Sequence, residues 1–178
     1  MVYVFLAEGF EEVEALAPVD LLRRAGAEVR TVGVGGKQVT GSHGIPVTAD
    51  LEEKEFDPEQ AEMLVLPGGA GTKNLDHSPF VRSAVASAAE RGKYLAAICA
   101  APSVLGHMGL LKGHQAVCFP GYEEELGAAS IPDLPVCVSG KIITARGAGV
   151  ALEFGLTLVQ VLFGSEKSQE IRKKIQCM

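Results

Sequence analysis

The stretch of sequence that decides the fold is YLAAICAAP, residues 94–102. Its first five residues form an apolar run, and Cys99 follows them directly, just before Ala100, Ala101 and Pro102. A buried strand followed by a proline suited to the first turn of a helix predicts a sharp strand-to-helix turn. Such turns hold a side chain above the carboxyl edge of a parallel sheet, where open α/β folds place ligand crevices.

Cys99 is therefore a candidate nucleophile. A helix that begins just after Cys99 would point backbone N–H groups and the positive end of its dipole at the sulfur, which predicts a lowered thiol pKa. Only the thiolate is a strong nucleophile. Because a lone cysteine after a strand is more often an inert core residue, the assignment depends on other parts of the chain.

Continuous apolar runs alternate with helical patterns along the chain, which predicts a mostly parallel sheet buried on both faces. The predicted strands are residues 2–7, 29–34, 63–66 and 95–98. Short strand-like pieces between residues 35 and 50 predict a small hairpin or lobe, and residues 136–144 predict a hairpin appended to the sheet. We expect one domain over residues 1–178.

The first helix is expected from about Glu11 to Arg24, with Gly26 as its stop. A proline inside a helix removes a hydrogen bond and clashes with the preceding turn, so Pro18 predicts a kink or a restart near Ala17. The side chains expected to face the core are Val13, Leu16 and Leu21.

Three later helices are also expected. Ser78 as N-cap, Pro79 at the first position and Gly92 beyond the end define the clearest of them. Residues 150–163 form an apolar helix that we expect to be deeply buried or in a subunit contact, and an amphipathic helix begins near Ser165.

Composition excludes several classes of protein. The 178 residues are 47% hydrophobic and 21% charged, with a net charge of −6, which argues against disorder and against a nucleic-acid partner. No apolar stretch reaches membrane-spanning length, and residues 1–7 are expected to form a first strand rather than a signal peptide. Four cysteines without CxxC spacing favour a reducing cytoplasm.

Other motifs do not support a cofactor or metal. Residues 68–73 lack the Gly-Lys-Ser/Thr ending of a phosphate loop, and residues 33–38 lack the third glycine of a dinucleotide fingerprint. The four histidines have no metal-ligand spacing and are expected to be ordinary surface or core residues: His43, His77, His107 and His114. Cys118 is expected to be a buried strand cysteine. The alternative is that Cys118 lies near the pocket, because it adjoins Phe119.

Two further features converge on Cys99. Gly68 and Gly69 follow a predicted strand, where their backbone could approach a ligand and present N–H groups to an oxyanion. Glu14 lies in the first strand-to-helix connection, which parallel topology brings to the same sheet edge. A carboxylic acid beside a thiolate would have a raised pKa and could move protons. Taken singly, Glu14 could equally be a solvated carboxylate and the glycines a plain turn.

Four motifs in order across nearly the whole chain give a more specific resemblance. They are EGFEEVEA at 8–15, LPGG at 66–69, AAICAAP at 96–102 and RGAG at 146–149. Together they resemble the ThiJ/PfpI superfamily, in its DJ-1/YajL-like branch of parkinsonism-associated deglycase relatives. The resemblance implies a flavodoxin-like three-layer α/β sandwich of the class I glutamine amidotransferase type, and a homodimer.

The resemblance also implies roles for particular residues. Cys99 would be the catalytic cysteine, hydrogen-bonded to a protonated Glu14. Backbone N–H groups of Gly68, Gly69 and Ala100 would surround the reacting carbonyl. Candidates for lining the pocket are Phe119, Pro120 and Arg146.

Two positions of this chain differ from the family pattern and reduce the range of expected functions. Superfamily members proposed as peptidases carry a histidine directly after the nucleophile, whereas this chain has Ala100, so a peptidase is disfavoured. Phe119 precedes Pro120 where the human-like branch has a histidine, as in some bacterial relatives related to YajL. Glu14 is then the only strong proton carrier expected beside Cys99.

Two functional hypotheses follow. The leading one is a cofactor-independent glyoxalase or deglycase acting on methylglyoxal, glyoxal or early glycation adducts through Cys99. The alternative is a redox-sensing stress protein or chaperone in which peroxide oxidises Cys99 to a sulfinate. Expected partners are a small α-dicarbonyl or a glycated protein, with neither nucleic acid nor membrane.

Overall fold

Seven strands form one central sheet in the computed structural model, which describes residues 1–128 and 130–177. Across the sheet the order is β5 (Leu51–Glu52), β2 (Val29–Val34), β1 (Val2–Ala7), β6 (Met63–Leu66), β7 (Tyr94–Ile98), β9 (Ile142–Ala145) and β8 (Val136–Ser139). All neighbouring pairs are parallel except β8 and β9, which form the predicted hairpin. The four predicted strands and the mostly parallel sheet are confirmed.

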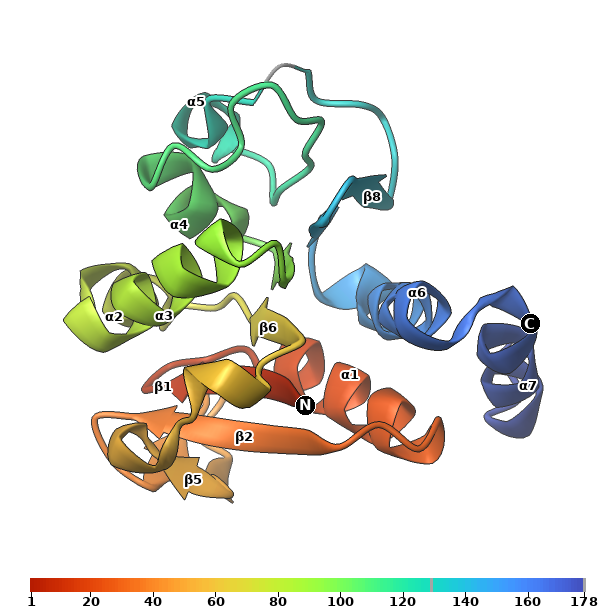
Figure 1. Cartoon of the computed structure of the whole chain (residues 1–178), viewed down its shortest axis with the longest axis horizontal. Helices are drawn as coiled ribbons and strands as arrows, with labels where there is room; N and C mark the ends of the chain where they lie inside the picture. The colour runs from red at the N-terminus through yellow and green to blue at the C-terminus, as the bar shows by residue number, and fades with distance from the viewer. Residues whose placement is uncertain (129, 178) are drawn as a thin grey trace.

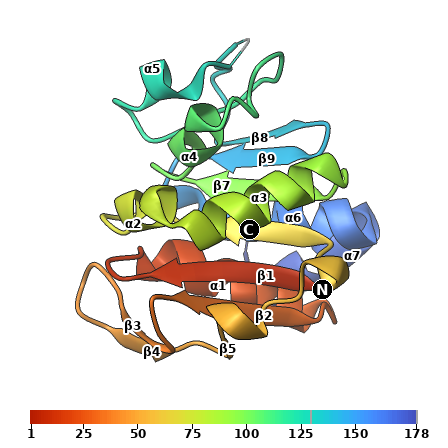
Figure 2. The same cartoon turned by 60° about the vertical axis from the view of Figure 1, so that its left-hand side comes forward.

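Helices cover both faces of this sheet (Figures 1 and 2). One face packs against α1 (Glu12–Arg24) and α6 (Ala151–Phe163), and the other against α2 (Thr72–His77), α3 (Pro79–Glu90) and α4 (Pro102–His107). α7 (Ser165–Lys174) packs against α6. Alternate residues of β1 belong to the two separate cores, as the two-residue period of a strand requires. This is the predicted flavodoxin-like three-layer sandwich.

The remaining elements are short. β3 (Gln38–Thr40) and β4 (Pro46–Thr48) form the small antiparallel hairpin predicted between residues 35 and 50. α5 (Glu123–Leu126) is a single turn, and 3-10 turns cover Glu53–Glu55, Pro58–Gln60 and Ala148–Val150. Within the described residues, none of the helices combines the length and apolar character that a membrane crossing requires.

The first helix departs from two expectations. Of the kink or restart expected near Ala17, the restart does not occur, because α1 continues through Pro18. Pro18 packs against α6 where Gly155 has no side chain: a Cβ on Gly155 would lie 3.1 Å from the Pro18 Cα. Tight packing where the two helices cross compensates for the stability that is lost with the hydrogen bond that proline removes. Val13, expected to face the core, is 51% exposed, whereas Glu14 on the same turn is buried. Leu21 is buried as predicted.

The other helix predictions are confirmed. The Ser78 hydroxyl accepts a hydrogen bond from the Val81 N–H at 3.2 Å, which caps α3, and Gly92 beyond its end has a positive φ of 64°. The apolar helix and the amphipathic helix appear as α6 and α7. Cys118 is buried as predicted, but it lies in a loop rather than in a strand.

Strand order brings the candidate site together. β1, β6 and β7 are neighbours in the sheet, so the connections that follow them meet at one carboxyl edge. The chain moves from β1 to β2 on one side and to β6 on the other, which makes this edge a topological switch point. Glu14, Gly68 and Cys99 each follow one of these three strands.

Candidate active site

Cys99 occupies a sharp turn between β7 and α4. Its φ of 65° lies in the left-handed region, which a residue with a side chain rarely adopts. Two backbone hydrogen bonds hold this conformation: the Cys99 N–H donates to the Ala145 carbonyl at 2.9 Å, and the Cys99 carbonyl accepts from the Phe119 N–H at 2.8 Å. The turn leaves the thiol half-buried at the sheet edge.

Glu14 lies against this thiol from the first turns of α1. Its side chain is 1% exposed, and its Oε2 accepts a hydrogen bond from the Gly68 N–H at 2.9 Å. The carboxyl also forms hydrogen bonds with the Cys99 thiol and with the backbone of Ala148. Burial raises the pKa of Glu14 to about 7, although these hydrogen bonds partly oppose the rise.

The pKa of the Cys99 thiol is raised, which corrects the expectation of a lowered value. Burial and repulsion from ionised Glu14 raise the pKa of Cys99 to about 12, although N–H groups of Gly69 and Ala100 donate to the sulfur and lower it. α4 is only six residues long, so its dipole is a weak source of stabilisation. The sequence showed the turn but not how deeply the sulfur is enclosed.

The two raised pKa values describe one coupled pair that retains a proton. At a pH near 7 the pair loses its first proton, and the remaining one can lie on either Glu14 or Cys99. When it lies on Glu14, the repulsion disappears and the carboxylic acid can donate a hydrogen bond to the thiolate. The thiolate can therefore form while the second proton stays on Glu14, without ionising both groups.

The three N–H groups expected around a reacting carbonyl divide between two tasks. Those of Gly69 and Ala100 point at the Cys99 sulfur, where a group bonded to that sulfur would meet them. The N–H of Gly68 is already bonded to Glu14, so it positions the carboxyl instead of facing a substrate. This corrects the expectation for Gly68. The sequence alone could not show that its N–H lies within hydrogen-bond distance of Glu14.

Gly68 is also needed for space, and this gives a testable prediction. A Cβ at position 68 would lie 2.5 Å from the Cys99 Cβ and 2.6 Å from Glu14 Oε2, so Gly68→Ala must separate the pair. We expect it to lower the free energy of unfolding by about 1–3 kcal/mol and to slow alkylation of Cys99. Urea denaturation and peptide mass spectrometry measure the two effects.

Gly149→Ala is the matched control, because a Cβ at position 149 meets no heavy atom within 4 Å. We expect its free energy of unfolding to stay within about 0.5 kcal/mol of the unmodified protein. Equal behaviour of the two variants would contradict close packing at Gly68.

The three candidates for lining the pocket have different surroundings. Phe119 is 48% exposed and lies over Gly147, where a Cβ would be 3.2 Å from its ring and 3.8 Å from Glu14 Oε1. Arg146 is directed to Asp133, to which it donates a hydrogen bond at 2.7 Å. Pro120 is exposed in the turn that follows Phe119. Of the three, only Phe119 is joined to the site by these contacts.

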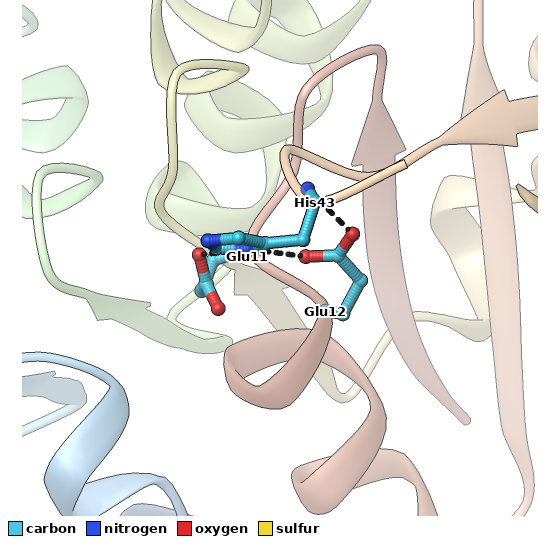
Figure 3. A group of neighbouring side chains, drawn as sticks. All are labelled: Glu11, Glu12 and His43. Carbon is cyan, nitrogen blue, oxygen red and sulfur yellow. Dashed lines mark hydrogen bonds and ion pairs between the residues drawn. The ribbon is translucent and has the colours of Figure 1, made fainter. Parts of the chain in front are cut away.

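A second polar cluster lies near the start of α1, where Glu11 and Glu12 meet His43 from the β3–β4 hairpin (Figure 3). Their ligand atoms lie within 4.8 Å of one another, a grouping that sequence spacing did not reveal. Burial alone would raise the pKa of Glu12, but hydrogen bonds from His43 and nearby backbone lower it to about 2. Hydrogen bonding to Glu12 in turn raises the pKa of His43.

These three groups could bind a divalent cation, but each already has a protein partner. Glu12 accepts from the His43 N–H at 2.8 Å and lies 3.0 Å from His43 Nδ1, and Glu11 accepts from the Ser42 hydroxyl at 3.0 Å. A Cβ on Gly41 would collide with the Glu12 carboxylate. The cluster therefore ties the hairpin to the helix that carries Glu14.

Comparisons with known proteins agree with this geometry. The DJ-1/PfpI family model matches residues 1–161. Protein dj-1beta of Drosophila melanogaster is 36% identical over 174 residues, covering 96% of this chain and 93% of that protein. Glutathione-independent glyoxalase DJR-1.2 of Caenorhabditis elegans is 28% identical over 170 residues, covering 94% and 91%.

The fold is equally similar to solved structures. Oxidised DJ-1 of Toxoplasma gondii has a TM-score of 0.94 with this chain at 36% sequence identity. The match covers 98% of this chain and 97% of the other. Similarity in sequence and in fold thus extends over nearly the whole chain.

Proposed function

This chain belongs to the DJ-1/PfpI family, and from that premise we propose that it is a cofactor-independent glyoxalase and deglycase. Its substrates would be methylglyoxal, glyoxal and early glycation adducts. The observation that carries the proposal is the hydrogen-bonded pair of Glu14 and Cys99, with the N–H groups of Gly69 and Ala100 directed at the sulfur. A relative of similar length is itself named a glutathione-independent glyoxalase.

The reaction begins with the thiolate. Cys99 adds to the aldehyde carbon of methylglyoxal, and the resulting alkoxide accepts hydrogen bonds from Gly69 and Ala100 before it takes the proton from Glu14. Glu14, now ionised, removes the hydrogen from this carbon to give an enediolate and returns that proton to the neighbouring carbon, while the hydroxyl proton moves from the first oxygen to the second. The product is a lactoyl thioester on Cys99.

Water completes the sequence. It attacks the thioester carbonyl, the carbon–sulfur bond breaks, and lactate leaves with the Cys99 thiol regenerated. The sum is one methylglyoxal and one water converted to one lactic acid, so no cofactor or outside oxidant is consumed. Early glycation adducts would enter by the same addition of sulfur to a carbonyl carbon.

We also propose a cytoplasmic homodimer. Three large apolar side chains on α1, the β3–β4 hairpin and α6 are about half exposed: Val13, Ile45 and Leu152. Burial of these side chains against a second copy of the chain would remove them from water, which supports a dimer interface there. Light scattering at micromolar concentration should therefore give twice the chain mass, and a monomer would count against the dimer.

The test of this function is lactate formation by the purified, reduced protein. Methylglyoxal should be consumed without added glutathione, and lactate should appear in equal amount. Heat-denatured protein is the control for uncatalysed loss of the aldehyde onto lysine and arginine side chains. Consumption without lactate, or no consumption at all by protein with a reduced Cys99, would contradict the glyoxalase assignment.

Oxidation of Cys99 is the second candidate function. The sulfur is half-buried and faces two N–H donors, which would stabilise a negatively charged sulfinate as well as an alkoxide. One similar structure is described as oxidised. Mild peroxide should add two oxygen atoms to the peptide that contains Cys99, and preferential oxidation of Cys177, the other half-buried cysteine, would contradict this role.

A further inference from the structure

An exposed aromatic ring lies beside the Cys99 site. Phe119 is 48% exposed, although burial of a phenylalanine side chain is normally favourable. Its backbone is fixed to the nucleophile, because the Phe119 N–H donates to the Cys99 carbonyl at 2.8 Å. The Tyr122 N–H donates to the Phe119 carbonyl at 3.2 Å, which closes the turn that carries the ring. The ring is therefore held beside the reacting residue while about half of this residue's surface stays open.

The ring also reaches the site through Gly147. A Cβ at position 147 would lie 3.2 Å from Phe119 Cδ2 and 3.8 Å from Glu14 Oε1, so this glycine lies between the ring and the carboxyl. Glu14 in turn forms a hydrogen bond with the Cys99 thiol. The ring is thus connected to the nucleophile by two routes, one through the backbone and one through the proton carrier.

The charged groups near the ring do not favour an anion. The Glu14 carboxyl lies across Gly147 from the ring, and Glu123 accepts a backbone hydrogen bond at 2.7 Å in the turn that follows the ring. Arg146, which precedes Gly147, donates to Asp133 at 2.7 Å. One paired cation beside two carboxyl groups gives an anionic substituent little attraction. An exposed ring in these surroundings instead suits a neutral aromatic group, which can stack on it or meet its edge.

We propose that Phe119 is a specificity-determining residue whose ring packs against a neutral aromatic substituent of the substrate. The inference rests on the proposed function at Cys99 and names its preferred substrate class, which is arylglyoxals and their early adducts. In phenylglyoxal the ring is attached two bonds from the aldehyde carbon that the sulfur attacks, so a phenyl group bound through Cys99 stays close to Phe119. The reaction is otherwise unchanged, because one phenylglyoxal and one water give one mandelic acid.

The kinetic test compares an aromatic substrate with a small one. The quantity of interest is kcat/KM for mandelate formation from phenylglyoxal divided by kcat/KM for lactate formation from methylglyoxal. Mandelate is measured because the reaction of phenylglyoxal with arginine side chains yields none. Phe119→Ala should lower this ratio roughly tenfold, and Phe119→Tyr should retain most of it, since tyrosine keeps the ring. An unchanged ratio in Phe119→Ala overturns the proposal.

Phe163→Ala is the matched control for the loss of an exposed ring. Phe163 is 43% exposed and is the last residue of α6, a helix of 13 residues. It therefore lies about 20 Å from the start of that helix, which follows the Ala148 backbone bonded to Glu14. The ratio should be unchanged in Phe163→Ala. A fall equal to that in Phe119→Ala would overturn the proposal, because the ratio would then not depend on the ring beside Cys99.

An alkylation test keeps the aromatic contact separate from turnover. The rate of Cys99 alkylation by 2-iodo-N-phenylacetamide is divided by the rate with iodoacetamide. Dividing this value by the same ratio at Cys177, the other half-buried cysteine, corrects for the different reactivities of the two reagents. The corrected ratio should exceed one and should fall roughly threefold or more in Phe119→Ala. A rise in that variant would mean that the ring obstructs aromatic groups, which contradicts the proposal.

The failure of this inference and the failure of the proposed function can be told apart. If the protein forms neither lactate nor mandelate, but Phe119→Ala lowers the corrected alkylation ratio, the proposed function is wrong and the aromatic contact stands. If lactate formation is normal but Phe119→Ala changes neither the kinetic ratio nor the alkylation ratio, the proposed function stands and Phe119 does not determine specificity.

Discussion

Replacement of Cys99 by alanine is expected to abolish lactate formation from methylglyoxal, with a loss of at least about 1,000-fold. The reason is chemical, since the carbon–sulfur bond of the hemithioacetal cannot form without the sulfur. The folded structure should persist, because alanine occupies the same turn and the backbone hydrogen bonds to Ala145 and Phe119 involve no side chain. Lactate appearance, measured beside circular dichroism of the variant, checks both parts.

Cys137→Ala is the matched control for this variant. Cys137 is a buried cysteine in β8, at the far edge of the sheet from β1, so its thiol takes no part in the proposed reaction. We expect its turnover to stay within about threefold of the unmodified protein, apart from any loss of stability. Full turnover in Cys99→Ala would show that aldehyde is consumed elsewhere on the protein.

Glu14→Gln is expected to lower turnover by at least about 100-fold while it makes the folded protein more stable at alkaline pH. Glutamine can still accept the hydrogen bond from the Gly68 N–H, so the local structure should persist. It cannot carry a proton between the two substrate carbons, and it cannot donate the carboxylic acid proton to the thiolate. Cys99→Ala should thus remove the nucleophile, and Glu14→Gln should separately remove the proton carrier.

The direction of the stability effect follows from the raised pKa. Burial raises the pKa of Glu14 from 4.5 to about 7 in the folded state, so folding favours its protonated form. That contribution is fully present below pH 4.5 and is lost as pH rises through 7. Above pH 7 the folded protein holds a buried carboxylate, which Glu14→Gln removes.

Denaturation by urea at two pH values measures this effect. The stability advantage of Glu14→Gln over the unmodified protein should grow by roughly 2 kcal/mol between pH 5 and pH 8. Asp20→Asn, a change at an exposed carboxylate of the same helix, is the control and should show no comparable growth. A constant advantage would mean that the folded-state pKa of Glu14 is ordinary.

Much of the fold could be predicted because its signals are local. The runs at residues 2–7 and 63–66 are apolar without alternation, which is typical of strands covered on both faces, and Ser78 with Pro79 marks a helix start by its own chemistry. Parallel topology by itself places Glu14 and Cys99 at one edge of the sheet.

The sequence-based predictions that the structure corrects concern properties that depend on three-dimensional packing. Pro18 stays inside α1 because Gly155 on a distant helix makes room for it. The Cys99 pKa rises because burial and Glu14 outweigh two N–H groups, a balance that requires depth and distance. The grouping of His43 with Glu12 was equally hidden, since only the β3–β4 hairpin brings these two residues together.

The central claim is that Glu14 and Cys99 act as one pair that holds a single proton at neutral pH. The most direct measurement is the pH dependence of Cys99 alkylation by iodoacetamide, followed by peptide mass spectrometry to separate it from Cys177. For the unmodified protein the rate should rise with pH through about 7. In Glu14→Gln the rise should move above the ordinary thiol pKa of about 8.5. Identical profiles for the two proteins would contradict the coupling.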